Sequence, residues 1–152
     1  APFYSPDARA GFFGISPHTT RAELQRAVFE GLAFAIVDAL QGYPQGGELY
    51  LTGGGAASAT WLQIIADCTG RTVVSSAFNE LSARGAAILA ARSVAALAET
   101  PPLAQTRYQP RPQAHARYAA LYPVYRLLRE QMLPVWQARQ AALQPLSQDL
   151  QP

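Results

Sequence analysis

The most constraining feature of this chain is a short apolar run that ends in three consecutive glycines. Residues 49–51 are Leu-Tyr-Leu, Thr52 follows, and Gly53, Gly54 and Gly55 lead directly into an amphipathic stretch. Glycine has no Cβ and tolerates positive φ, so its backbone can pass close to another group. This order predicts a buried strand, a tight backbone turn and a helix. The start of such a helix offers free N–H groups to an anion.

A plain strand-to-helix turn without a ligand fits the same residues. Ser58 and Thr60 lie where the helix would begin, and either side chain could cap that helix or reach a phosphate. Capping alone is the simpler interpretation, because serine and threonine are common at helix starts whether or not a ligand is bound. On the local pattern, both a ligand-binding loop and a plain turn stay open.

Two well-known nucleotide-binding loops do not fit this stretch. A dinucleotide site needs a third glycine where this chain has Ser58, and an acidic residue after the next strand, where it has Ser75 and Ser76. A phosphate loop needs a lysine, and all twelve basic residues of this chain are arginine. What remains is a glycine turn whose bare backbone can press against a flat or anionic ligand. A nucleotide is the leading candidate for that ligand.

The first helix signal starts at Thr19 or Thr20, either of which can cap a helix. Glu23 lies three places after Thr20, which is the spacing of a capping box. Apolar residues then recur at every fourth position and predict a helix of roughly six turns with an apolar stripe along one face. The stripe consists of Leu24, Val28, Leu32, Ile36 and Leu40.

Strand and helix signals alternate after that helix. We expect a strand at 48–52, a helix that ends at Gly70, and a second strand with β-branched residues at 72–76. An alanine-rich helix follows at 82–97, and its small side chains would let it approach its neighbours closely. The alternation favours an α/β layered domain with parallel strands.

The ends of the chain carry weaker signals. Residues 12–15 could form a short strand, and residues 99–113 carry four prolines and read as a linker or surface loop. Residues 114–144 return to helical character with a row of aromatic side chains. Pro123 and Pro134 interrupt this last stretch, so we expect two or three helical pieces.

The composition excludes several classes of protein and site. A net charge of +2 in 152 residues gives no support to nucleic-acid or membrane binding. Cys68 is the single cysteine, on the apolar face of a predicted helix, and with two histidines a zinc site is not expected. No membrane span or secretory signal is visible, so we expect a soluble cytoplasmic protein. The chain opens on Ala1 without a methionine, which suggests a start inside a longer protein.

Three motifs, in order and at the right spacing, resemble those of the FGGY family of carbohydrate kinases. The first resembles the family's second signature, the next its adenosine-binding motif in the form found in xylulokinases, and the last its late small-residue helix. The first motif comprises residues 10–15, His18 and residues 23–31. The adenosine-binding motif lies at residues 53–67. The small-residue helix lies at residues 83–90, where Arg84 replaces the usual leucine. The resemblance covers roughly residues 1–98.

The resemblance implies a particular fold. These kinases have two actin-like, ribonuclease H-like domains with the active site in the cleft between them. This chain would be most of the C-terminal half of such a two-domain sugar kinase. Residues 1–98 would form the actin-like domain without its first strands, residues 99–113 a Pro-rich linker, and residues 114–144 a helical tail packed on the domain.

The resemblance also implies a nucleotide site at Gly53, Gly54, Gly55 and Ala59. Gly54 and Gly55 would lie against the adenosine of ATP. Ala59 matches a position at which the related glycerol kinases carry an adenine-contacting asparagine. Alanine cannot make that hydrogen bond, so selectivity for the base at this position is in question. The flat surface that the glycines would offer to the adenosine does not depend on it.

The implied reaction is transfer of the γ-phosphoryl group of ATP, with Mg²⁺, to a sugar hydroxyl, and xylulose or a related pentulose is the first expectation. The family places the catalytic aspartate and most sugar contacts in the N-terminal kinase domain. No catalytic or metal-binding residue is therefore predicted here, and the chain alone should bind nucleotide weakly and be inactive. The expected partners are the N-terminal domain and the sugar in the cleft between the domains. A homodimer is left open.

Other residues are weaker candidates for chemistry. Asp7 reads as a solvated loop residue, and Asp67 lies at the end of a predicted helix. The tyrosines of the tail favour domain packing over a ligand cage. A competing hypothesis is a non-catalytic actin-like module that binds nucleotide or a partner and assembles through its aromatic tail. A Rossmann-type oxidoreductase already fails at Ser58.

Overall fold

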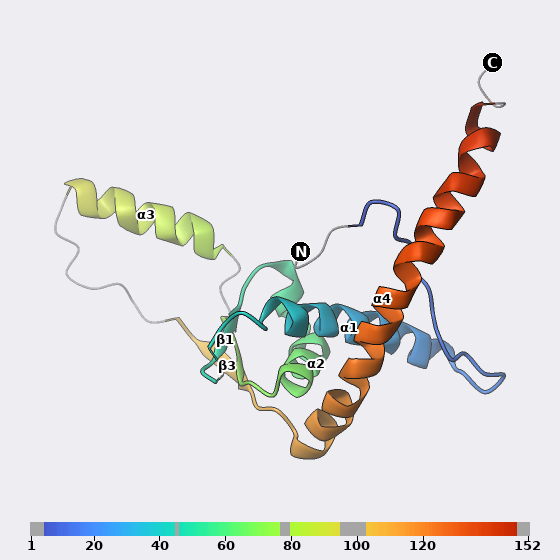
Figure 1. Ribbon diagram of the computed structural model, residues 1–152. Helices are drawn as coiled ribbons and strands as arrows, with labels where there is room; N and C mark the ends of the chain where they lie inside the picture. The colour runs from blue at the N-terminus through green and yellow to red at the C-terminus, as the bar shows by residue number, and fades with distance from the viewer. Residues whose placement is uncertain (1–4, 45, 77–79, 95–102, 149–152) are drawn as a thin grey trace. The chain divides into compact units, whose positions relative to one another are not determined.

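The computed structural model describes residues 5–44, 46–76, 80–94 and 103–148 (Figure 1). It divides into two compact units, one formed by Tyr43–His115 and the other by the residues up to Gly42 together with those from Ala116 on. The elements are, in order, α1 (Arg21–Ala39), β1 (Leu49–Leu51), the 3-10 helix η1 (Gly54–Ala57), α2 (Ala59–Thr69), β2 (Val73–Ser76), α3 (Leu81–Val94), β3 (Gln105–Tyr108) and α4 (Pro112–Gln148).

The unit Tyr43–His115 contains a three-stranded sheet in the order β1-β2-β3. β1 and β2 are parallel, as the sequence predicts, with Leu49 opposite Val73 and Leu51 opposite Ser75. α2 connects these two strands, and its apolar face packs with β2 into the core of the unit. The largest fully buried apolar side chains are Leu62, Ile64, Ile65, Val73 and Val74.

Both ends of α2 agree with the sequence signals. At its start the Ser58 hydroxyl oxygen accepts a hydrogen bond from the Trp61 backbone N–H at 3.3 Å. At its end Gly70 adopts the left-handed conformation, with φ of 67°, and its N–H donates to the Ala66 carbonyl at 2.9 Å. Glycine is favoured at such a helix end because other residues are strained there. The predicted burial of Cys68 on the apolar face of this helix is also confirmed.

Strand β3 lies inside the stretch 99–113, where the sequence predicts a linker or loop, and that expectation is wrong for Gln105–Tyr108. The strand pairs antiparallel with β2, with Val74 opposite Arg107, so the sheet is mixed. Four mostly polar residues carry no periodic signal of their own. The strand forms because β2, much earlier in the chain, offers it a hydrogen-bonding edge.

The other unit begins with α1, whose predicted capping box is confirmed. The Glu23 N–H donates to the Thr20 hydroxyl oxygen at 3.2 Å, and the Thr20 N–H donates to the Glu23 carboxylate at 2.7 Å. These two bonds satisfy donors that the first turn of a helix leaves open. The hydrogen bonds of Thr20 lower the pKa of the Glu23 carboxyl below its ordinary value.

The buried face of α1 differs from the apolar stripe that the sequence predicts. Val28 and Leu32 of that stripe are 51% and 54% exposed, whereas Ala33 and Phe34 are buried. The Phe34 ring packs against the tyrosines of α4, with ring centroids 5.2–6.0 Å away. Those rings belong to Tyr118, Tyr122 and Tyr125. The contact face of α1 is therefore set by α4, and the tyrosines serve helix packing.

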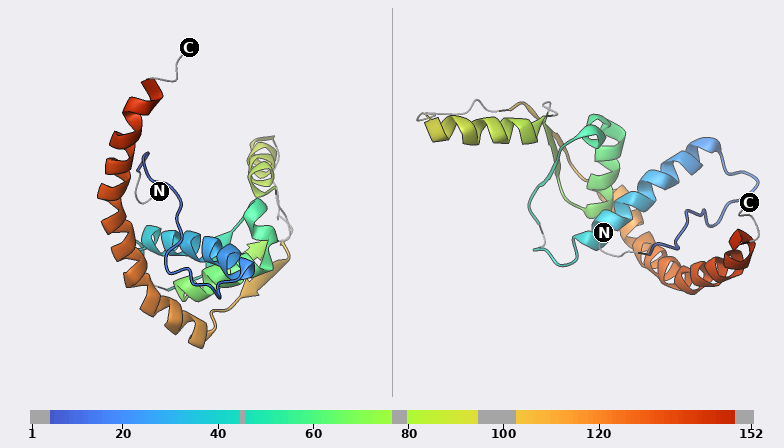
Figure 2. Two further views of the ribbon diagram at one scale, coloured as in Figure 1. Left: turned by 90° about the vertical axis from the view of Figure 1, so that its right-hand side faces the viewer. Right: turned by 90° about the horizontal axis from the view of Figure 1, so that it is seen from above.

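Helix α4 is continuous through both prolines, and the expectation of two or three pieces is wrong. Figure 2 shows the helix curving along its length without a break. A proline removes one backbone hydrogen bond and bends a helix, but it does not end the helix when contacts on both sides hold it. Tyr122 and Tyr125 flank Pro123 and both pack on Phe34. Although α4 has 37 residues, none of the described helices is long and apolar enough to cross a membrane.

Two further expectations meet a different outcome. Residues 12–15 form no strand, and Phe13 is 83% exposed, because this stretch has no neighbouring strand to pair with among the described residues. The alanine-rich helix is present as α3 from Leu81 to Val94, while the rest of its predicted range, 95–97, lies outside the described residues. None of the residues of α3 is buried, so the expected close packing is not seen in this part of the chain.

Candidate functional site

The glycine turn at the end of β1 has a backbone shape that requires glycine at its first position. Gly53 has φ of 84° and ψ of −173°, which residues with a Cβ rarely adopt. Its carbonyl accepts a hydrogen bond from the Ala56 N–H at 3.0 Å, and Gly54–Ala57 form the short 3-10 helix η1. The tight turn that the sequence predicts is thus present, with one 3-10 turn inserted before α2.

The turn presents bare backbone to open space. A Cβ added to Gly53 or to Gly54 would meet no other atom within 4 Å, and Gly54 and Gly55 are both exposed. A Cβ on Gly55 would touch the indole of Trp61, at 3.5 Å from its Nε1 atom. Gly54 therefore combines open space at its Cβ position with an exposed backbone, and a flat group can approach its main chain closely.

The structure brings the predicted site residues into one continuous surface stretch. Gly53, Gly54 and Gly55 form the turn, and Ala59 is the exposed first residue of α2. Ser58 between them is used as the helix cap, with its side-chain oxygen on the Trp61 N–H. The capping interpretation of Ser58 is confirmed, because its hydroxyl oxygen is used by the Trp61 N–H, and the exposed part of the turn is main chain.

A side chain of the neighbouring strand holds this turn. The Ser75 hydroxyl donates to the Ala56 carbonyl at 3.2 Å, and Ser75 is only 7% exposed. Ser75 lies opposite Leu51 in the β1–β2 register, next to the point at which the chain leaves β1. This contact could not be predicted from a local pattern, because 19 positions separate its two partners.

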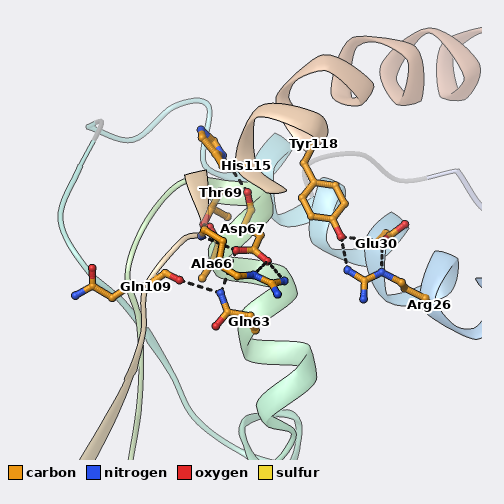
Figure 3. A network of polar contacts seen from close by, with 10 residues as sticks. Arg26, Glu30, Gln63, Ala66, Asp67, Thr69, Gln109, His115 and Tyr118 are labelled. Atoms are coloured by element: carbon orange, nitrogen blue, oxygen red, sulfur yellow. Dashed lines mark hydrogen bonds and ion pairs between the residues drawn. The ribbon is translucent and has the colours of Figure 1, made fainter. Parts of the chain in front are cut away.

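A second polar cluster surrounds Asp67, which is fully buried on α2 (Figure 3). The Arg111 guanidinium donates to Oδ2 of Asp67 at 2.5 and 3.1 Å, and the Arg111 backbone N–H donates to Oδ1 at 2.8 Å. The Gln63 side-chain amide donates to Oδ1 at 3.0 Å and to the Gln109 carbonyl at 2.8 Å. These bonds tie α2 to the segment that joins β3 to α4.

The electrostatics of Asp67 fit a structural role. Burial acts to raise the pKa of Asp67, but the hydrogen bonds from Arg111 and Gln63 outweigh it and hold that pKa below its ordinary value. A carboxylate whose oxygens are occupied by an arginine and two amides is poorly placed to take a proton from a substrate. The sequence reading missed this cluster. The available signal was the position of Asp67 among the apolar residues Ile64, Ile65 and Cys68, since a buried carboxylate needs a cation nearby.

In the other unit, two carboxylates of α1 accept hydrogen bonds from tyrosines of α4. The Tyr118 hydroxyl donates to Glu30 at 2.7 Å and accepts from Arg26 at 2.8 Å (Figure 3). About two helical turns further along α1, Asp38 accepts a hydrogen bond from Tyr122 and pairs with Arg129. The pKa values of Tyr118 and Tyr122 are both raised to about 12. Burial of the hydroxyl is the largest cause, and the hydrogen bond to the neighbouring carboxylate is the next. These acidic groups therefore serve the contact between the two helices.

We expect Tyr118→Phe to lower the free energy of unfolding by about 1–2 kcal/mol, because the buried ring stays while two hydrogen bonds to charged groups are lost. Urea unfolding of the chain measures this, and Tyr43→Phe, at a 65% exposed tyrosine, is the control that should change nothing. The pKa of Tyr118 is raised above its ordinary value of 10.0 to about 12, so its stabilisation is full below pH 10 and is lost as the pH rises toward 12. Equal effects of the two variants would contradict the assigned contacts.

The described residues offer no ready metal site. Across them, no three His, Cys, Asp or Glu side chains gather in a way that could hold a metal ion. Oxygen ligands are what Mg²⁺ requires. No residue of the described chain is therefore assigned as a ligand of Mg²⁺.

Comparison with known proteins gives consistent results. A family model described as "FGGY family of carbohydrate kinases, C-terminal domain" matches residues 1–94. A probable L-xylulose kinase of Pasteurella multocida is 33% identical over 125 residues, which are 79% of this chain and 26% of that protein. A glycerol kinase of Koribacter versatilis is 37% identical over 122 residues, 73% of this chain and 24% of that protein. The crystal structure of a xylulose kinase from Rhodospirillum rubrum matches with a TM-score of 0.73 and 28% identity, over 87% of this chain and 28% of that one. The chain thus spans about a quarter of the length of the curated relatives that it matches.

Proposed function

The chain belongs to the FGGY family of carbohydrate kinases, as part of its C-terminal domain, and on that premise we propose that it supplies the ATP-binding surface of a sugar kinase. The observation that carries the proposal is the open main chain at Gly54, where an added Cβ would meet no atom within 4 Å. A purine is flat and can lie directly against a backbone that carries no side chains.

Each residue of the turn has a distinct part in this proposal. Gly53 supplies the positive φ that turns the chain out of β1, and Gly54 and Gly55 supply the surface for the adenosine. Ala59, at the exposed start of α2, adds contact but has no side-chain group that could hydrogen-bond the base. The site would therefore recognise the flat face of the nucleotide more than the edge of its base.

The proposed reaction is transfer of the γ-phosphoryl group of ATP to a sugar hydroxyl. Such reactions depend on positioning of the two reactants and on stabilisation of the phosphate charge, which Mg²⁺ supplies when it is bound with the nucleotide. This chain would hold the nucleoside end in place. The carboxylate that accepts the proton of the hydroxyl would come from an N-terminal domain, which would also provide most sugar contacts.

The substrate, the fold class and the location are further parts of the proposal. Relatives named as xylulose and L-xylulose kinases support a pentulose such as xylulose as the sugar. The likeness to xylulose kinase structures supports assignment of the actin-like, ribonuclease H-like fold class to residues 1–98, with a helical tail. A kinase of this kind acts on metabolites of the cytoplasm, where we propose that it works.

Titration of the isotope-labelled chain with ATP and Mg²⁺ tests the proposal. We expect the amide resonances of Gly54 and Gly55 to shift first, because these groups would lie against the nucleoside. Resonances of α1, which contributes no residue to the turn, should move little. Failure of saturating ATP to shift the glycine amides would overturn the proposal.

A substitution at Gly54 makes the test sharper. Gly54→Leu should weaken ATP binding at least about tenfold, because the new side chain would occupy the space of the purine. Folding should be unaffected, since an added Cβ meets nothing within 4 Å. Gly31→Leu is the matched control, because its Cβ also meets open space but lies on α1. Unchanged affinity in Gly54→Leu would place the nucleotide elsewhere.

A further inference from the structure

Ser75 stands out among the residues of the central strand. β2 begins with Val73 and Val74, both fully buried, and Ser75 follows at 7% exposure. A hydroxyl in such surroundings is unfavourable unless it is hydrogen-bonded. Its partner is the carbonyl of Ala56 at 3.2 Å, in the glycine turn and not in the sheet.

This hydrogen bond differs in kind from those within the turn itself. The Ala56 N–H donates to the Gly53 carbonyl, and the Ser58 N–H donates to the Gly55 carbonyl, so both bonds join residues of the same turn. The bond from Ser75 joins the turn to a buried strand. A run of three glycines has many accessible backbone conformations, and an anchor on a rigid element restricts them.

We propose that Ser75 is a positioning residue, which holds the glycine turn in the shape that receives the nucleotide. The inference rests on the proposed function of that turn. Without the anchor, the turn would sample other conformations, and the nucleotide would have to order it on binding. The role of Ser75 would thus be exerted through the backbone of residues 54–56, without direct contact with the ligand.

Ser75→Ala tests this role, since it removes the hydroxyl and leaves the strand and its register intact. We expect the dissociation constant for ATP with Mg²⁺ to rise about five- to tenfold, because a preorganised site becomes a flexible one. In the absence of nucleotide, amide hydrogen exchange at Ala56 and Ser58, whose N–H groups are hydrogen-bonded within the turn, should become faster. This second measurement does not depend on any ligand.

A matched control separates positioning from a general loss of stability. Thr69→Val also removes a part-buried hydroxyl that donates to a backbone carbonyl, here that of Ile65 at 2.7 Å at the far end of α2. We expect it to lower stability at least as much as Ser75→Ala while leaving ATP affinity and exchange in the turn unchanged. If the two variants weaken ATP binding alike, or if Ser75→Ala binds ATP as the parent chain does, the inference is overturned while the ATP site stands. If the parent chain does not bind ATP, the proposed function fails, and the inference fails with it.

Discussion

Replacing Arg111 by alanine is expected to lower the free energy of unfolding by about 3–5 kcal/mol, because it leaves a buried carboxylate without its cation. Asp67 has no exposed side-chain surface, and its Oδ2 accepts both hydrogen bonds of the guanidinium. The remaining donors, the Arg111 backbone N–H and the Gln63 amide, are both on Oδ1. Chemical denaturation of the two chains measures the difference.

Two further variants identify the cause of that loss. Arg107→Ala breaks an exposed ion pair with Glu48, 2.9 Å long, and is expected to leave stability nearly unchanged. Adding Asp67→Asn to Arg111→Ala removes the unpaired charge and should recover a large part of the loss. If Arg111→Ala is as mild as Arg107→Ala, the ion pair does not hold this unit together.

The same cluster makes stability depend on pH in a defined direction. The folded pKa of Asp67 lies below its ordinary value of 3.8, so folding favours the charged form. The stabilisation is therefore fully present above the unfolded pKa and is lost as the pH falls through the folded one. Asp67→Asn should lose less stability than the parent chain between pH 5 and strongly acidic conditions.

Gly70→Ala is expected to lower the free energy of unfolding by about 2–4 kcal/mol. The backbone of Gly70 has φ of 67°, which costs a residue with a Cβ about 1–2 kcal/mol. In addition, an added Cβ would lie 2.6 Å from the His115 ring, and such overpacking costs about 1–3 kcal/mol. The ring is not free to move away, because its Nδ1 lies 2.9 Å from the Asp67 carbonyl oxygen and is hydrogen-bonded to it. Thermal or urea unfolding measures the loss.

A double variant separates the two contributions. The double variant Gly70→Ala with His115→Ala keeps the backbone strain at residue 70 but removes the overlap with the ring. Compared with His115→Ala alone, it should therefore lose only the part of the free energy of unfolding that comes from the backbone conformation. Gly31→Ala is the control within a helix, where an added Cβ meets nothing and a small gain in stability is expected. An equal loss in both backgrounds would contradict the close approach of the ring.

The parts of the fold that could be predicted are those with local causes. Thr20 with Glu23 marks the start of α1, and Ser58 and Gly70 mark the two ends of α2. A cap acts within one helical turn, so a few adjacent residues contain the whole signal. The parallel pair β1 and β2 was predictable for a similar reason, since each strand is a short apolar or β-branched run with a helix between them.

The parts that could not be predicted depend on distant partners. β3 forms only because β2 offers an edge, and α4 passes Pro123 because its tyrosines are held by Phe34 of α1. The candidate site divides in the same way. The turn at Gly53 could be read from its own residues, whereas the bond from Ser75 and the pairing of Asp67 with Arg111 join positions far apart in the sequence.

The indole of Trp61 beside Gly55 gives the turn a built-in optical reporter. Its ring lies within van der Waals reach of the space next to Gly55, and it sits in the first turn of α2. Tryptophan emission responds to such surroundings, so a rearrangement of the glycines should change its colour or intensity. The chain has one other tryptophan, Trp136 on α4, and its replacement by phenylalanine would make the signal report on the turn alone. Movement at this surface could then be followed in real time without attaching a dye.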